Sequence, residues 1–124
     1  MVDVRDIAAV AATALTERGH DGLEYHISGP EAISFEEAAE TLSGALKRPV
    51  RYVDVSPEEY RGILSSRHIP EWFVEDSLGI FKALSSGRAS RVLTTAADVG
   101  SVSAIPFSSF VRDHIDAFVH LPTR

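Results

Sequence analysis

The charged residues near the start of the chain form the first cluster whose residue types could bind a ligand. Asp3, Arg5 and Asp6 fall within four positions, and carboxylates beside a guanidinium provide strong polar contacts. A purely structural role is the alternative interpretation: Asp is a preferred helix N-cap, so Asp6 would begin a helix and Arg5 would form an ion pair. The two roles are compatible, and we keep Asp3 and Arg5 as candidate binding residues.

A second set of candidates lies in the middle of the chain. Trp72, Phe73 and Phe81 stand on one expected helix, preceded by His68 in a loop. Aromatic residues at helical spacing are more often core than ligand contacts, and a loop histidine is by default solvated. Trp72 falls just off the main apolar stripe, which favours partial exposure. These four residues are therefore candidates for binding a small-molecule substrate or a partner.

Other chemistries lack the residues they need. No G-x-G-x-x-G turn can be drawn through the eight glycines, and a dinucleotide site needs such a turn at the start of a helix. We therefore expect no cofactor bound by this chain alone and assign no catalytic residue. The chain has no cysteine, and no two of its five histidines have the helical spacing of metal ligands, so we expect no metal site. The histidines are His20, His26, His68, His114 and His120.

Composition limits the class of protein. The chain has 124 residues and a net charge of −6, which indicates one globular domain over residues 1–124 and argues against a nucleic-acid partner. No run of about 18 apolar residues would span a membrane, and the start of the chain does not resemble a signal peptide. We expect a cytoplasmic protein without a membrane partner.

The periodicity of apolar residues predicts alternating strands and helices. Short strands are expected at residues 2–4, 23–27 and 50–55. Five helices are expected: one capped by Asp6, one after a Ser34–Glu37 capping box, one after Ser56-Pro57, one over residues 71–85, and a last one capped by Ser108. Residues 88–106 show no firm period. The prediction is an α/β fold in which so small a sheet cannot cover five helices, so a neighbouring sheet must belong with it.

Several segments in this order resemble NmrA-like proteins, atypical members of the short-chain dehydrogenase/reductase superfamily. The similar segments are VDVRDIA at 2–8, YHISGPEA at 25–32, SFEEAA at 34–39, RPVRYVDV at 48–55, SPEEY at 56–60, and residues 107–118. The resemblance covers only the C-terminal part of such proteins. In the family the preceding half carries the glycine loop and most cofactor contacts. The Tyr-x-x-x-Lys pair of the superfamily is also absent from this chain.

The resemblance implies the C-terminal part of a Rossmann-like fold, acting as the substrate-side lobe of an NAD(P)-dependent oxidoreductase. The aromatic helix would then lie over a substrate cleft, and Asp3 and Arg5 at a strand end where such folds bind ligands. NAD(P) is implied only for a complete relative, whose other half would come from another chain or have been lost by truncation. The alternative is a non-catalytic redox sensor that binds a regulatory partner. A homo-oligomer that covers the exposed apolar faces is a further expectation.

Overall fold

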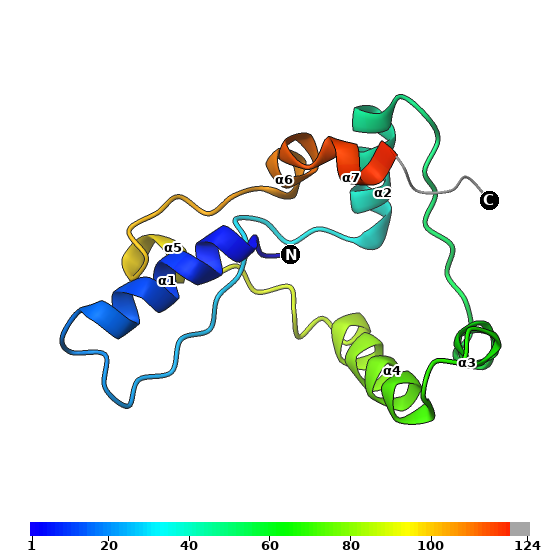
Figure 1. Ribbon diagram of the computed structural model, residues 1–124, viewed down its shortest axis with the longest axis horizontal. Helices are drawn as coiled ribbons and strands as arrows, with labels where there is room; N and C mark the ends of the chain where they lie inside the picture. Colours follow the sequence, from blue (N-terminus) through cyan, green and yellow to red (C-terminus); the bar gives the residue numbers. More distant parts are fainter. Residues whose placement is uncertain (120–124) are drawn as a thin grey trace. The chain divides into compact units, whose positions relative to one another are not determined.

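The computed structural model describes residues 1–119, and these form two compact units. The first unit combines residues 1–51 with the chain from residue 91 onward, and the second comprises Tyr52–Ser90. Each unit is built from helices joined by extended segments (Figure 1). No described helix has the length and apolar character needed to cross a membrane.

The first unit is organised around two helix contacts. Helix α1 (Val4–Thr16) packs against the short α5 (Thr95–Asp98), and α2 (Phe35–Leu46) packs against α6 (Phe107–Asp113) and α7 (Ile115–Val119) (Figure 1). The residues buried at these contacts are small, so the helices can approach closely. The buried apolar residues of this unit are Val10, Ala38, Ala39, Ala96 and Val111.

Gly100 permits the close contact between α1 and the α5 region. A Cβ atom at this position would stand 2.9 Å from the carbonyl oxygen of Ala96 and 3.1 Å from Cγ2 of Val10. Both distances are shorter than ordinary van der Waals contact, and two of the three nearest atoms belong to backbone. The packing of α5 on α1 therefore depends on the missing side chain.

The second unit is a pair of helices, α3 (Pro57–Ser66) and α4 (Glu71–Ser85), which pack against each other. The guanidinium of Arg61 donates to the carboxylate of Glu75 at 2.8 Å, and Tyr60 meets Phe81 edge-on at 5.5 Å between ring centroids. Val74 is the buried apolar residue of this unit.

Local capping signals predict three of these helices well. Both capping boxes form: Ser34 with Glu37 begins α2, and Ser56 with Glu59 begins α3. Helix α4 begins after Pro70 and ends at Ser85, as predicted. The two capping boxes work because each satisfies free backbone N–H groups through residues only three positions apart, whereas Pro70 makes no side-chain cap bond to α4.

Two predicted caps are wrong. Helix α1 begins at Val4, so Asp3 is its N-cap and Asp6 lies inside its first turn. Helix α6 begins at Phe107 after Pro106, and Ser108 is its second residue. In both cases the helix begins earlier in the sequence than predicted. Asp3 and Pro106, which precede the predicted caps, already have the extended backbone that an N-cap requires.

The three predicted strands are not formed within residues 1–119. Val4 is already helical, and residues 23–27 and 50–55 are extended without a strand partner. A strand exists only as part of a hydrogen-bonded ladder. Here side chains provide hydrogen bonds instead: Leu93 N–H donates to Ser28 Oγ at 2.8 Å, and Thr95 Oγ1 donates to His26 O at 2.7 Å.

Ser43 serves the second extended segment in the same way. The N–H of Val50 donates to Ser43 Oγ at 2.8 Å, and the carbonyl oxygen of Val50 lies 3.0 Å from the same hydroxyl. The hydroxyl has one hydrogen, which the carbonyl oxygens of Val50 and of Ala39, at 2.8 Å, share. Ser43 therefore occupies the N–H of Val50 fully and its carbonyl oxygen in part.

Candidate functional site

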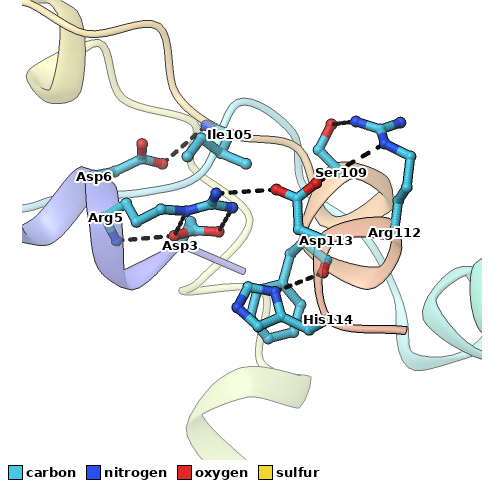
Figure 2. A network of polar contacts seen from close by, with 9 residues as sticks. Asp3, Arg5, Asp6, Ile105, Ser109, Arg112, Asp113 and His114 are labelled. Atoms are coloured by element: carbon cyan, nitrogen blue, oxygen red, sulfur yellow. Dashed lines mark hydrogen bonds and ion pairs between the residues drawn. The ribbon is translucent and has the colours of Figure 1, made fainter. Parts of the chain in front are cut away.

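Asp3 is the central residue of a polar network at the beginning of α1. Its carboxylate accepts from the backbone N–H of Arg5 at 2.8 Å, from Arg5 Nε at 3.0 Å and from Arg5 Nη2 at 2.9 Å (Figure 2). Its side chain is only 1% exposed. A buried carboxylate requires such partners, and here one residue provides both a cap contact and a bidentate ion pair.

Arg5 extends the network to α6. Its Nη1 donates to Asp113 Oδ2 at 3.0 Å, across 108 positions of the sequence. The Arg5 and Asp113 side chains are 47% and 39% exposed, respectively. Water therefore screens this outer pair, and its stabilising effect is smaller than that of the Asp3–Arg5 pair.

A second buried carboxylate joins α1 to the segment before α6. Asp6 is 1% exposed and accepts from the backbone N–H of Ile105 at 2.9 Å (Figure 2). Arg5 and Asp6, adjacent in the first turn of α1, thus hold both ends of residues 105–113 against this helix. We name Asp3, Arg5, Asp6, Asp113 and the Ile105 N–H the α1–α6 network.

An open depression of about 360 Å³ lies beside this network. Its lining is mainly apolar and includes two aromatic rings of α6. The rings of Phe107 and Phe110 are nearly parallel, 6.2 Å apart, and His114 stacks on Phe110 at 4.5 Å. The lining residues are Met1, Val2, Asp3, Ile105, Phe107 and Phe110.

The orientation of the His114 ring is fixed by the backbone. Its Nδ1 lies 2.9 Å from the carbonyl oxygen of Phe110 (Figure 2). A carbonyl oxygen can only accept a hydrogen bond, so the proton is assigned to Nδ1 in this contact. The imidazole is thereby held flat against the Phe110 ring.

The structure separates the predicted site residues into two groups. Asp3 and Arg5 lie together in the first unit, whereas the other four lie in the second. His68 is exposed just after α3 with φ +58°, a backbone conformation uncommon for residues other than glycine. Trp72 is 67% exposed and meets Phe73 edge-on at 5.9 Å, while Phe81 contacts Tyr60.

Sequence reasoning missed the α6 side of the depression. Phe107, Phe110, Asp113 and His114 were expected only to form a terminal helix. The aromatic residues at 107, 110 and 114 are three and four positions apart, which places them on one face of a helix. That spacing was a usable signal, but nothing in the sequence linked this face to Asp3, about 100 positions earlier.

No metal site is evident in the described part of the chain. Among residues 1–119, no three His, Asp or Glu side chains come close enough to hold an ion. His20 bonds to the hydroxyl of Tyr25 at 2.7 Å, and His26 lies 3.1 Å from Glu24 on the surface. His120 lies outside the described residues.

We expect the α1–α6 network to lower the pKa of Asp3. Hydrogen bonds from the Arg5 side chain lower the pKa of Asp3 from 3.8 to about 2, and burial opposes this shift. Because the folded-state pKa is the lower one, the stabilisation is complete above pH 3.8 and is lost as the pH falls towards 2. Carboxyl-carbon NMR should show a midpoint near 2 for Asp3, rising towards 3.8 in Arg5→Ala. A midpoint at 3.8 in the unaltered protein would contradict the network.

The arrangement favours binding over acid–base catalysis. Both oxygens of Asp3 are engaged by Arg5, so this carboxylate is poorly suited to take a proton from a ligand. The depression instead presents a mainly apolar, aromatic surface whose one buried charge is already paired. Such a surface suits a flat, uncharged molecule.

Comparison with known proteins gives the chain a clear set of relatives, although no family model matches it. It is 36% identical over 117 residues to an NAD(P)H azoreductase of Xenophilus azovorans, covering 94% of this chain and 41% of the azoreductase. It therefore spans about two-fifths of the length of such curated relatives.

Solved structures support the same relationship. Citrobacter sp. triphenylmethane reductase in complex with NADP(H) is 31% identical, with a TM-score of 0.78 over 90% of this chain and 39% of the reductase. The NADPH-dependent quinone oxidoreductase QOR2 of Escherichia coli superposes with a TM-score of 0.82 over 92% of this chain at 21% identity, which supports the fold alone. Over nearly its whole length, the chain thus matches a C-terminal portion of NmrA-like, atypical short-chain dehydrogenase/reductase proteins.

Proposed function

We propose that this chain is the substrate-side lobe of an NmrA-like, NAD(P)H-dependent reductase and does not bind the dinucleotide by itself. One observation carries the proposal: nearly the whole chain matches these reductases, yet it covers only about 40% of their length. The two compact units would act together as one lobe over residues 1–124.

The positions of the glycines support the proposal that the chain does not bind the dinucleotide by itself. Gly19 and Gly22 have φ values of +96° and +72° and follow the end of α1. A pyrophosphate is bound where a glycine turn opens a helix and directs backbone N–H groups at the phosphates. These two glycines instead form the turn after a helix, which is their common structural role.

Large apolar side chains on the described surface support a covering partner. Leu15 is 85% exposed and Val4 68%, both on α1, and Val53 is 70% exposed in its extended segment. Apolar helix faces and unpaired extended segments are stabilised when a sheet covers them. The nucleotide-binding part of a complete reductase would supply that sheet.

The relatives suggest the class of electron acceptor. The names of two of them refer to azo compounds and triphenylmethane dyes, which are conjugated molecules. We propose that this lobe binds an acceptor of that class while NAD(P)H on the complementary part donates hydride. The reaction would take place in the cytoplasm, which suits a chain without cysteine.

Binding of NADPH tests the proposal directly. Isothermal titration of NADPH into the isolated chain should show no saturable heat. A fusion of the chain to the region of the Xenophilus azovorans azoreductase that precedes the matched segment should bind NADPH and bleach an azo dye. Micromolar 1:1 binding by the isolated chain would overturn the proposal. A folded fusion that binds NADPH without reducing dye would contradict a substrate-side role.

The exposed Trp72 favours a second candidate function, a regulatory module that binds a partner protein. Exposed aromatic side chains are common in protein interfaces, and Trp72 and Phe73 lie adjacent on α4. A stable complex disrupted by Trp72→Ala would support this role, and a complex unaffected by that substitution would count against it.

A further inference from the structure

We propose that the depression beside α6 is the binding site for one aromatic ring system of the electron acceptor, with Phe107 and Phe110 as the residues that select flat ligands. This inference rests on the proposed function for its ligand class. It assigns that ligand to α6 and the start of α1, of which the sequence pointed only to Asp3 and Arg5.

The size and lining of the depression suit a small, apolar ligand. Its volume of about 360 Å³ falls within the roughly 300–1,000 Å³ typical of small-molecule sites. Met1, Val2 and Ile105 provide apolar contacts, and Phe107 and Phe110 provide two rings. A ring system seated here would remove apolar surface from water on both partners.

Phe107, Phe110 and His114 form an aromatic stack on α6 and its C-terminal cap. Phe110 lies between Phe107 and His114, with interplanar angles of 21° and 27°. The bond from His114 Nδ1 to the Phe110 carbonyl holds this outer ring in place. Phe110 also meets Phe118 of α7 edge-on at 6.3 Å. The ring that contacts the ligand is therefore oriented before binding, which reduces the entropy lost on binding.

The charged side chains around the depression are paired with one another. Asp3 has the only charged side chain in the lining, and Arg5 pairs with both of its oxygens. The guanidinium of Arg5 is also shared with Asp113. Neither side-chain charge is left to attract a counter-ion, so the lining side chains offer an anionic ring no charged partner.

Binding of menadione (2-methyl-1,4-naphthoquinone) to the isolated chain tests this assignment without any cofactor. The chain has no cysteine, so the quinone cannot form thiol adducts that imitate binding. Amide NMR shifts should change with saturation at Asp3, Ile105, Phe107 and Phe110. The non-aromatic diketone cyclohexane-1,4-dione should cause no saturable change at these positions.

Matched substitutions separate the depression from other aromatic surfaces. Phe107→Leu keeps a large apolar side chain at the first residue of α6 and should weaken menadione binding about 3- to 10-fold, the effect of one ring contact. Phe35→Leu, the same change at the first residue of α2 and outside the lining of the depression, should leave the affinity unchanged. Phe110→Leu provides a second variant.

Three outcomes would overturn the assignment: no saturable shifts with menadione, shifts confined to α4, or equal affinity in Phe107→Leu. The proposed function fails by a different result, since it depends on NADPH binding. A chain that binds NADPH alone would refute the lobe proposal and leave the menadione site intact.

Discussion

Replacing Asp3 with alanine should lower the free energy of unfolding by about 2–4 kcal/mol. The substitution removes a helix N-cap, worth roughly 1 kcal/mol, and a buried carboxylate that accepts charge-assisted bonds from Arg5, at about 1.5–3 kcal/mol. It also leaves the Arg5 guanidinium with only the partly exposed Asp113. Urea denaturation followed by circular dichroism measures the change.

Two further variants separate the cap from the ion pair. Asparagine is as good an N-cap as aspartate, so Asp3→Asn should retain the cap and lose only the charge. Asp116→Ala removes an exposed acid in the first turn of α7 and should change stability by less than about 0.5 kcal/mol. If Asp3→Ala costs no more than this control, the network does not stabilise the fold.

Gly100→Ala should destabilise the first unit by about 1–3 kcal/mol, the usual cost of forcing an extra group into a packed contact. The added methyl group would press on the Ala96 carbonyl and on Val10, which belongs to α1. The backbone of a packed helix pair cannot yield as a flexible side chain would. Thermal or urea unfolding measures the loss.

Gly44→Ala is the matched control, and it should raise the free energy of unfolding. Gly44 lies inside α2, and a Cβ there would meet no atom within 4 Å. Alanine at an open helical position stabilises by about 0.4–1 kcal/mol, because glycine loses more freedom on folding. If Gly44→Ala and Gly100→Ala shift stability equally, the close contact at Gly100 is not a constraint.

Local signals predicted the parts of the fold that depend on neighbours in sequence. The caps at Ser34 and Ser56 gave the starts of α2 and α3 because each signal is complete within four residues. The C-terminal relationship to NmrA-like proteins was also predicted and is confirmed by the reductases it matches. The strand at residues 50–55 failed, because β-branched residues indicate an extended backbone but cannot supply the partner that makes it a strand.

The candidate site was only half predictable for a related reason. Asp3 and Arg5 are two positions apart, so their pairing could be anticipated from composition and spacing. Asp113 and Ile105 join them from about 100 positions away, and a single sequence carries no information on that distance. The four-residue helix α5 was missed because one turn is too short to show a period.

The hydrogen bond between the Ser43 hydroxyl and Val50 bears on self-association of the chain. An extended run of β-branched residues with free N–H and C=O groups is a template on which foreign chains can add, the first step of aggregation. By accepting from the N–H of Val50, α2 occupies one of these backbone groups at the N-terminal end of the segment. We expect this contact within the chain to make strand addition at residue 50 less favourable than along the rest of the segment.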